Sequence, residues 1–591
     1  GNITFANFSD FMLGIPQQTR IGNGITDRAF RAADYNLFVQ DDWKFSPKLT
    51  FNLGLRYELD LPAYETRGRI ATFDPTLYRP SATLTGPPLG GIVQARNSPA
   101  GYDLPDIGNV GKRILNSIDA NNFAPRVGLA YVPFDKIPFA LRVGYGIYYS
   151  RSALAYLVSN IAQPPFYFNT ILANPARVAN FQSPFAPNVP TQFPTLTGSF
   201  SGISFDRNIR TPYFQQFNAA AQFAILHDTT LEIAYVGSRG LNLFRQVAIN
   251  QARLASPQNP VFNPVTMQNV ISNTPADAMI RAPFQGVALG SGFLQDQSTA
   301  QSTYHSLQIN VTRRLSRGLQ FQVSYTLSKS IDNASGGGGA GTNGLTDTLV
   351  SGDTGVIIGN QLDSRANRGL SNFDRRHRFV SSFTWQLPRP AFTKRSRIGR
   401  NLSSGWQIAG IAMAMSGSPI DVVDSLAGSF YLGVNGGGAR PNFVQGISPM
   451  GSIPNGYYFN PFAFARPTVV AGQIIPSSNG MAIASATGTD FGNVGRNILS
   501  GPKQFNTDFS IGKRFPISET KKIEFRAEIF NLFNNVNYAN PISNFAAVQQ
   551  SGGSIDPISG RINVDNSGDF GKIISTSNNP RIVQLAVKFK F

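Results

Sequence analysis

Hydrophobic and polar residues alternate with a period of two along most of the chain. The last residues show the pattern without interruption, because one parity holds only Val583, Leu585, Val587, Phe589 and Phe591. The same alternation recurs in residues 35–45, 49–58, 139–150, 318–330 and 521–533. This period is typical of β-strands with one apolar and one polar face. No window of comparable length shows helical periodicity, so the pattern predicts an all-β protein.

The length of these runs distinguishes a membrane barrel from a soluble sandwich. Strands of soluble sheets usually have about 5 or 6 residues, whereas a tilted membrane-spanning strand needs about 9–11. The runs here reach the second length, and aromatic residues such as Tyr35 and Trp43 stand near their ends, as in interfacial girdles. We therefore predict an all-β transmembrane antiparallel β-barrel of the outer-membrane type. Its apolar parity would face lipid and its polar parity the lumen, with the lumen-facing candidates Arg56, Glu58, Arg142, Glu524, Arg526 and Glu528.

Short and long connections alternate between the predicted strands. The short links are residues 46–48, 135–137, 227–228, 316–318 and 516–519, and residues 389–401 take the same place in the order. The long segments are residues 61–122, 151–210, 239–301, 331–374, 417–502 and 534–579. Outer-membrane barrels combine short periplasmic turns with long extracellular loops. We therefore expect the C-terminus on the periplasmic side and the long loops outside the cell.

The number of predicted strands points to a larger barrel. We count about 13, whereas bacterial barrels normally have an even number, and an open sheet would leave two unpaired edges in lipid. We therefore expect further strands upstream of this chain. Residues 1–31 are interpreted as an upstream barrel strand or an extracellular loop, and residues 32–591 as the C-terminal part of the barrel.

Composition excludes several classes of function. Only 14% of the residues are charged, against roughly 25% in average soluble domains. The net charge of +18 comes from scattered Lys and Arg, which argues against nucleic-acid binding. The chain has no Cys, and hence neither disulfides nor thiolate metal sites. It begins without Met or a signal-like segment, so we expect a removed leader or a longer parent protein.

The sequence offers no pattern typical of a metal or cofactor site. His227, His305 and His377 are far apart and lack metal-ligand spacing. The glycine-rich residues 335–344 lack the Lys-Ser/Thr ending of a phosphate loop and are read as a flexible loop. We expect no cofactor.

Charged clusters likewise favour structural roles. Glu524 and Glu528 share one face and could form a catalytic dyad, but a charge ladder that contacts a plug is favoured. Asp41 and Asp42 point to opposite faces of a strand and cannot act together. The basic run at residues 374–378 could bind an anionic substrate or a lipopolysaccharide phosphate, although a solvated rim is the favoured interpretation. We predict that the protein is not an enzyme.

Aromatic residues in two long connections are candidates for ligand contact. Residues 457–467 and 164–169 mix aromatic side chains with Asn and Pro, which could stack on sugars or hold extended peptides. The candidates are Tyr457, Tyr458, Phe459, Phe462, Phe464, Phe166 and Tyr167. The favoured alternative is that these residues pack against one another in an extracellular cap.

Several segments resemble the barrel of TonB-dependent outer-membrane transporters. They include "DYNLFVQDDWKFSPKLTFNLGLRYE", "NNFAPRVGLAYVPF", "FDRRHRFVSSFTW" and, most specifically, "GRNILSGPKQFNTDFSIGKRFPISETKKIEFRAEIFNLFNNVNYANP". Together they are similar to the Oar-like branch, whose members join a carboxypeptidase-regulatory-like domain and a plug to a barrel of 22 strands. The resemblance covers residues 30–591, but neither a plug nor a TonB box is visible in this chain.

The resemblance implies energised substrate uptake across the bacterial outer membrane, with extracellular loops that capture the ligand. It implies four kinds of partner: the lipid bilayer with lipopolysaccharide, a TonB-type energising complex, a plug domain in the upstream region, and the β-barrel assembly machinery. That machinery would read the terminal strand, so Val583, Leu585, Val587, Phe589 and Phe591 are the predicted assembly signal. A surface scaffold or adhesin is the alternative function, and a passive porin a weaker one.

Overall fold

The computed structural model describes most of the 591 residues. Left out are residues 1, 85, 100–107, 151–156, 158–159, 162–163, 174–178, 184–198, 256, 274–276, 336–354, 357–358, 362, 389–398, 400–402, 425–439, 468, 477–481, 487–491, 519, 557–558 and 565–566. The glycine-rich stretch predicted to be a flexible loop lies almost wholly outside the described residues.

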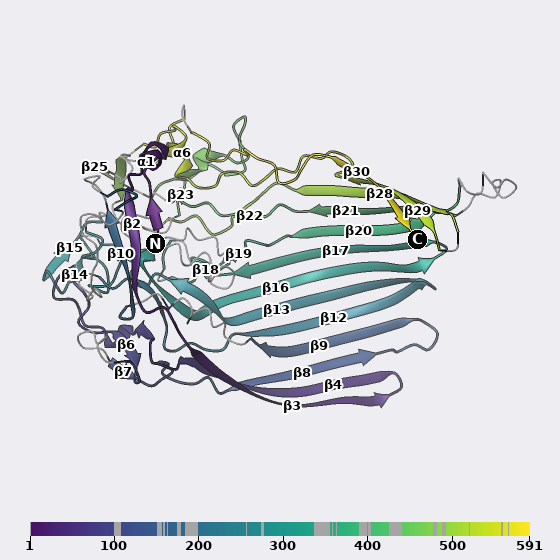
Figure 1. Cartoon of the computed structure of the whole chain (residues 1–591), viewed down its shortest axis with the longest axis horizontal. Coiled ribbons are helices and arrows are strands. Elements are labelled where there is room, and N and C mark those ends of the chain that lie inside the picture. The colour runs from purple at the N-terminus through teal and green to yellow at the C-terminus, as the bar shows by residue number, and fades with distance from the viewer. Residues whose placement is uncertain are drawn as a thin grey trace.

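Thirteen strands form one continuous antiparallel sheet in the described part of the chain (Figure 1). In spatial order they are β3 (Phe30–Ser46), β4 (Leu49–Glu65), β8 (Asn122–Tyr131), β9 (Phe139–Tyr149), β12 (Tyr213–Leu226), β13 (Thr229–Val247), β16 (Phe293–Ser316), β17 (Leu319–Asp332), β20 (His377–Gln386), β21 (Trp406–Met415), β28 (Gln504–Pro516), β29 (Lys522–Phe530) and β30 (Ile582–Lys590). Each strand pairs with the next along this series, as in an up-and-down barrel wall. The predicted fold class is confirmed.

The two kinds of connection lie at opposite ends of the sheet (Figure 1). The short hairpins, such as β3–β4 and β12–β13, lie at the end that also holds the C-terminus. The long segments, such as the one between β21 and β28, gather at the other end, here called the loop end. The predicted alternation of short and long connections is confirmed, but the bounds of the connection at residues 239–301 were wrong, because β13 continues to Val247 and β16 begins at Phe293. The predicted link at residues 389–401 lies almost wholly outside the described residues. The side of the membrane that each end occupies stays a prediction.

The strand register carries one apolar face across the whole sheet. Directly opposite residues in an antiparallel ladder point to the same face, and the ladders match apolar partners such as Leu37 with Tyr57 and Ala527 with Leu585. Leu585 is 78% exposed, which is unfavourable in water but favourable against lipid. This face is called the outward face below.

The ends of the sheet are β3 and β30, and no ladder joins these two strands in the described residues. Their outer edges therefore carry backbone groups without a strand partner within the described chain. Such edges are costly in lipid because no water is present to hydrogen-bond them. The expected additional strands stay a prediction.

Short strands and helices cover the loop end. One sheet contains β1 (Asn2–Thr4), β2 (Gln18–Gly24) and β10 (Tyr167–Ala173), and another β5 (Ala71–Phe73), β6 (Ile92–Ala95) and β7 (Gly108–Val110). Two-stranded pairs are β14 (Val261–Asn263) with β15 (Gln268–Val270), β22 (Pro419–Ile420) with β27 (Leu499–Ser500), β23 (Asn442–Phe443) with β24 (Phe464–Ala465), and β25 (Val469–Pro476) with β26 (Ala482–Ala486). The strands β11 (Gly202–Phe205), β18 (Gly355–Val356) and β19 (Gly369–Leu370) extend the main sheet by pairing with β16, β13 and β17.

Helical segments in the described residues are short. They are α1 (Phe8–Met12), α6 (Ala547–Gln550) and the 3-10 turns η1 (Pro75–Leu77), η2 (Gly290–Gly292) and η4 (Pro461–Ala463). None of the described helices has the length and apolar character needed to cross a membrane. The segment before β3 pairs with β10 rather than with the main sheet, while the division into residues 1–31 and 32–591 stays a prediction.

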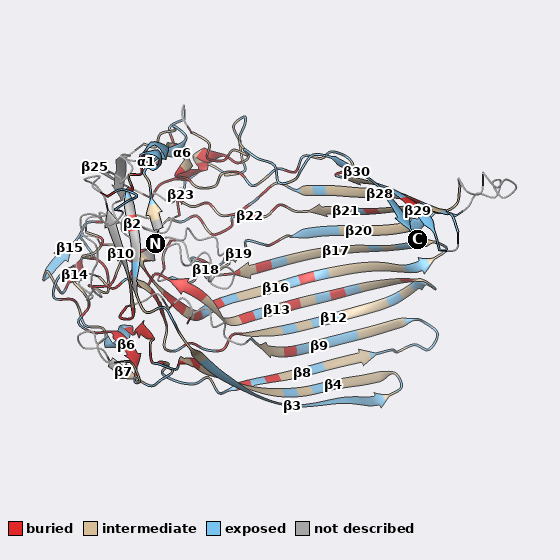
Figure 2. Cartoon of the chain, in the orientation of Figure 1, coloured by how far each residue is buried: buried red, intermediate tan, exposed pale blue. Residues whose placement is uncertain are grey.

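Buried residues gather mainly at the loop end, whereas the main strands are largely half-buried or exposed (Figure 2). The largest cluster, here called the loop core, contains Ile420, Val422, Phe459, Ala463, Phe464, Val494, Leu499, Phe545, Val548, Ile562 and Phe570. Two further clusters centre on Phe73 and Phe205. A single-layer wall has no interior of its own, so packing between loops supplies the folded core.

Candidate functional site

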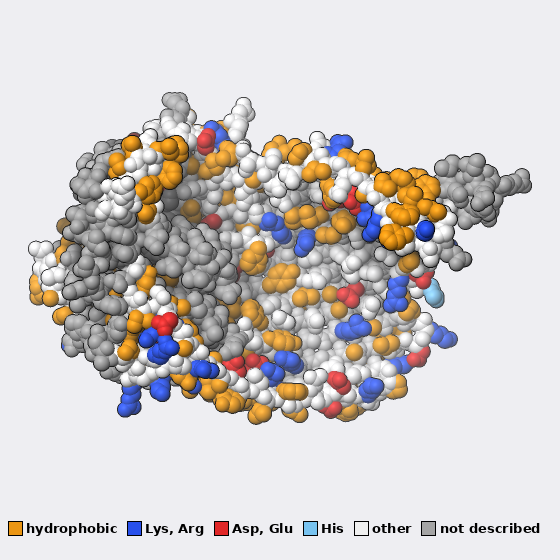
Figure 3. All heavy atoms as spheres, in the orientation of Figure 1, with side chains coloured by type: hydrophobic (Ala, Val, Ile, Leu, Met, Phe, Trp, Pro, Cys, Tyr) orange, Lys and Arg blue, Asp and Glu red, His pale blue; other side chains and the backbone are white. Residues whose placement is uncertain are grey.

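The face opposite the outward one is the candidate site, because its polar side chains cover a hollowed wall. Side chains of both charge signs are spread over this wall (Figure 3). The register places all six predicted lumen-facing residues on this face: Arg56, Glu58, Arg142, Glu524, Arg526 and Glu528. That the wall borders a lumen stays a prediction.

A ladder of ion pairs stabilises the polar face of β29. The Glu524 carboxylate lies 3.2 Å from Arg526, 3.8 Å from Arg514 and 4.0 Å from Lys590. Arg526 also lies 3.4 Å from Glu528. A guanidinium between the two carboxylates separates them, so this arrangement has the form of a charge ladder and not that of a dyad that shares a proton. The pair Arg56–Glu58, at 2.8 Å, repeats the motif on β4.

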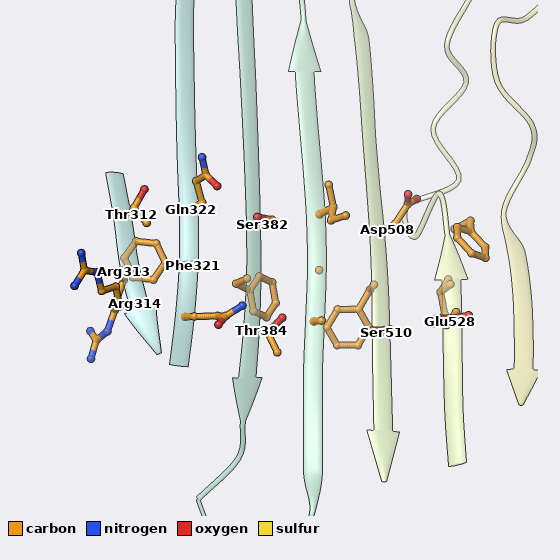
Figure 4. A pocket seen from close by; sticks show the side chains of 18 residues that line it. Thr312, Arg313, Arg314, Phe321, Gln322, Ser382, Thr384, Asp508, Ser510 and Glu528 are labelled. Carbon is orange, nitrogen blue, oxygen red and sulfur yellow. The ribbon is translucent and has the colours of Figure 1, made fainter. Parts of the chain in front are cut away.

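The wall contains a first hollow of about 560 Å³ between β16 and β29. Figure 4 shows Gln322, Ser382, Asp508 and Glu528 along it, each from a different strand. The carboxylate of Asp508 accepts hydrogen bonds from the Asn506 side chain at 3.0 Å and from the Asn531 backbone at 2.9 Å. The lining therefore offers fixed amide, hydroxyl and carboxylate groups to a hydrated solute.

A second hollow, of about 530 Å³, lies between β3 and β13 and is floored by glycine. Gly54, Gly128, Gly144 and Gly146 occupy the polar parity of three adjacent strands. A Cβ at Gly144 would stand only 2.7 Å from Asn218 Oδ1, whereas a Cβ at Gly54 would meet nothing closer than 3.7 Å.

Polar groups border this glycine floor. Arg126 lies over the Tyr148 ring at 4.7 Å, and Asn52 donates a 2.6 Å hydrogen bond to Asp42. The sequence prediction missed this hollow. Its signal was the run of glycines on the parity that elsewhere carries large polar side chains.

Among the aromatic candidates for ligand contact, three have fully buried rings. Phe459 and Phe464 lie in the loop core, and Phe166 lies in the cluster with Phe73. Their contacts are those of the alternative interpretation, in which loop aromatics pack against one another. A ligand could reach these rings only if the packing opened.

The other aromatic candidates are partly accessible. The Tyr458 hydroxyl donates to the Ser500 carbonyl at 2.9 Å, and the Tyr457 hydroxyl donates to the Gly568 carbonyl at 3.1 Å. Phe462 packs at the margin of the loop core, and Tyr167 lies in β10. For these four residues the ligand role stays a prediction.

Buried arginine–aspartate pairs join the loops and were not predicted. Arg466 contacts Asp424 through two hydrogen bonds of 2.7 and 3.2 Å. Arg496 and Asp332 approach to 2.6 Å although they are 164 positions apart. A single sequence carries no local signal for such partners, because they meet only through the fold.

Two buried carboxylates at the loop end have opposite pKa shifts. Burial would raise the pKa of Asp74, but hydrogen bonds from Thr76 and Arg207 outweigh it and lower the pKa. Burial raises the pKa of Asp296 to about 7, with Gln246 opposing the shift. Within the described residues, no hydrogen bond of normal geometry reaches either carboxylate oxygen of Asp296.

The three histidines occupy separate positions. His227 lies beside Asp228 at 3.2 Å in a hairpin. His305 and His377 lie on the outward face, where each ring Nδ1 approaches a tyrosine hydroxyl, that of Tyr235 at 2.7 Å and that of Tyr325 at 2.8 Å. In the described residues, no group of three His, Cys, Asp or Glu side chains could hold a metal ion.

The terminal apolar residues lie in β30 and at the residue after it, and the basic run at residues 374–378 spans the start of β20. Val583, Leu585, Val587 and Phe589 point outward from β30, and Phe591 ends the chain. In the basic run, Asp374 accepts a 2.6 Å hydrogen bond from the Ser330 backbone and so anchors the start of β20. The assembly role of the terminal residues stays a prediction.

Comparison with protein families gives a match that spans nearly the whole chain. The family model described as "Outer membrane beta barrel domain" matches residues 1–584. No curated protein matches the sequence significantly.

Similar solved structures include one transporter and two receptors. The outer membrane transporter YddB from Escherichia coli is 10% identical, with a TM-score of 0.41 over 94% of this chain and 45% of YddB. The P. aeruginosa receptor FpvA, bound to heterologous pyoverdines, is 8% identical and has a TM-score of 0.38. The match covers 95% of this chain and 39% of FpvA. The ferric-catecholate import receptor Fiu from E. coli K12 is 9% identical and has a TM-score of 0.35. The match covers 95% of this chain and 45% of Fiu. This chain spans less than half the length of each.

Proposed function

Because this chain belongs to the outer membrane β-barrel domain family, we propose that it forms the barrel wall of a TonB-dependent transporter. Its loops would face the cell exterior and its C-terminus the periplasm. Energy would come from a TonB-type complex that acts through a plug domain encoded upstream. The substrate would be a glycan fragment or a peptide too large or too scarce for passive diffusion.

The observation that carries this proposal is the largely polar face from β3 to β30, which is interrupted by apolar residues such as Ile411 and Met413 on β21. A polar inner face is common to outer-membrane barrels, but hollows of about 530 and 560 Å³ in that face leave room for a solute, which an adhesin does not require. Hydrogen-bonding groups along both hollows suit a hydrated substrate that passes along the wall. The resemblance of residues 30–591 to TonB-dependent transporters supports the same function.

The proposal can be tested with one substitution that fills a hollow. Gly54→Trp would place an indole in the second hollow, where the glycine leaves room for a Cβ. Ala527→Trp is the matched control, because Ala527 lies on the outward face opposite Leu585. The native bacterium would carry wild type, a deletion or one variant, and the removal of peptides and oligosaccharides from the medium would be followed by mass spectrometry.

We expect the deletion to abolish uptake of a subset of solutes, and a protonophore to do the same in wild type. Gly54→Trp should reduce this uptake at equal surface level, whereas Ala527→Trp should not. Uptake that is identical in the deletion strain and in wild type would overturn the proposal.

A surface scaffold or adhesin is the second candidate, and the loop core favours it. Loops that pack around Phe459, Phe464 and Phe545 form a folded surface rather than free capture loops. On this alternative the deletion strain would lose cell adhesion or a surface assembly while solute uptake stays unchanged.

A further inference from the structure

A groove on the outward face, near the loop end, combines an apolar floor with a basic rim. It has a volume of about 500 Å³ and lies between the main sheet and the connection that follows β29. Its lining residues are Tyr325, His377, Phe379, Ala414, Met415, Ser416, Lys503, Gln504, Phe505, Asn535, Val536 and Asn537.

The floor of the groove follows from the strand register. Tyr325, Phe379, Ala414 and Phe505 stand directly opposite one another on β17, β20, β21 and β28. The small Ala414 side chain therefore lies between two phenylalanines and leaves a depression on the lipid-facing surface. A methylene chain fits such a depression, because each buried CH₂ group contributes about 0.8 kcal/mol.

The far wall of the groove is held rigidly against the sheet. The Asn537 side chain accepts a 2.8 Å hydrogen bond from the Phe505 backbone N–H and donates a 2.9 Å bond to the Phe505 carbonyl. The groove is therefore bounded by fixed backbone, with Val536 exposed along it.

The rim toward the loop end carries basic side chains and no lining carboxylate. Lys503 and His377 both border the groove, and the Tyr325 hydroxyl contacts His377 Nδ1 at 2.8 Å. This contact orients the ring and leaves Nε2 at its opposite edge. Lys329 and His305, which are directly opposite each other on β17 and β16, continue the basic row on the outward face.

We propose that this groove binds a phosphorylated glycolipid of the lipopolysaccharide type, at the boundary between the membrane and the loop end. One acyl chain would lie over Ala414 between Phe379 and Phe505, and a phosphate would contact Lys503 and His377. A second phosphate on the same lipid could reach Lys329 and His305 along the row. Charge complementarity selects this occupant, because a row of two lysines and two imidazoles suits a lipid with more than one phosphate better than a lipid with a single one.

The experiment is native mass spectrometry of the whole protein purified from native outer membranes in mild detergent. Four forms are compared: wild type, Ala414→Trp, the double variant His377→Gln with Lys503→Gln, and the control Ala527→Trp. Ala414→Trp fills the floor of the groove, whereas Ala527→Trp adds the same ring elsewhere on the outward face. The glutamine variants keep polar side chains at the rim and leave the strands intact, so correct folding can be checked by heat-modifiable migration.

We expect wild type and Ala527→Trp to retain the phosphorylated glycolipid through extensive washing. Ala414→Trp and the glutamine variant should each retain it roughly tenfold less, as expected when one charge-assisted or chain contact is lost. Equal retention by all four forms would overturn the proposal. Retention of a phospholipid with one phosphate in place of the glycolipid would also overturn it, since the row of basic side chains would then not select the occupant.

Discussion

The buried pair of Arg466 and Asp424 permits a sharp test of what holds the loop end together. The Arg466 side chain is 4% exposed and the Asp424 side chain is 0% exposed. Arg466 also donates a 3.2 Å hydrogen bond to Gln549, and its guanidinium lies 5.9 Å from the centre of the Phe545 ring. The guanidinium therefore joins three separate segments beside the loop core.

The perturbation is Arg466→Met, which keeps most of the side-chain volume but removes the charge. It leaves the Asp424 carboxylate buried without its guanidinium, which typically costs 3–5 kcal/mol, or about 10² to 10⁴ in the equilibrium for opening. The double variant Asp424→Leu with Arg466→Met removes both charges, and it should regain most of the lost free energy, because an apolar pair avoids the desolvation of two ions.

The assay is native-state hydrogen exchange of loop-core amides, such as that of Val548, in the detergent-solubilised protein. Local opening of the loops is expected to precede unfolding of the sheet. The matched control is Lys572→Met, since Lys572 and Asp569 form a 3.1 Å pair whose side chains are 35% and 45% exposed. This exposed pair should contribute at most about 1 kcal/mol.

The result that would refute the reasoning is equality between the two sites. If Arg466→Met and Lys572→Met accelerate exchange by the same factor, the buried pair does not stabilise the loops. If the double variant is as unstable as Arg466→Met alone, the cost does not arise from burying the Asp424 carboxylate without the Arg466 guanidinium.

Three other predictions concern the loop end, the charge ladder and the terminus. Asp296→Asn should stabilise the loop end at pH 8 by roughly 4 kcal/mol but have little effect near pH 4. The reason is that the pKa of Asp296 is raised to about 7 in the folded protein, so the stability of the wild type falls as pH rises from the pKa of the unfolded chain to about 7. Protease resistance at pH 4, 6 and 8 checks this, and a pH-independent effect would contradict it. Glu524→Gln should weaken the pairing of β29 with β30 by roughly 1 kcal/mol, because Arg514, Arg526 and Lys590 then repel one another. Thermal unfolding should show this loss of stability at low salt and a smaller loss at 1 M salt. Deletion of Phe591 should lower the amount of heat-modifiable protein in outer-membrane fractions. The control Phe533→Ser, at an exposed loop phenylalanine, should not lower it. Equal amounts of heat-modifiable protein from the two variants would contradict the assembly role of the terminal residues.

Much of the sheet could be predicted because its causes are local. Alternation with period two marks each strand and its two faces, and sequential pairing means that no long-range partner has to be identified. The placement of the six charged residues on the polar face could be predicted from the same alternation, since a residue's parity in its strand decides its face. The hairpin order was visible in the same way from the spacing of turn residues.

The candidate site was less predictable because it depends on neighbours across strands. Gly128 and Gly144 are ordinary small residues in the sequence, and only the register sets them directly opposite each other on the floor of one hollow. Phe459 and Phe464 suggested a ligand surface, but packing around Phe570 buries both rings. Aromatic residues in a loop have the same local signature whether they meet a ligand or one another.

The sequence by itself determined the positions of the strands apart from the loop-end extensions of β13 and β16, together with the outward and polar faces and the order of short and long connections. Each of these follows from side-chain alternation within one strand or from the length of one link. The tertiary structure alone decided the loop core, the Arg466–Asp424 and Arg496–Asp332 pairs and the groove over Ala414. These features bring together residues that are 42 or 164 positions apart, or that lie on four different strands. Their energies come from burial and charge pairing, which exist only once distant segments have met.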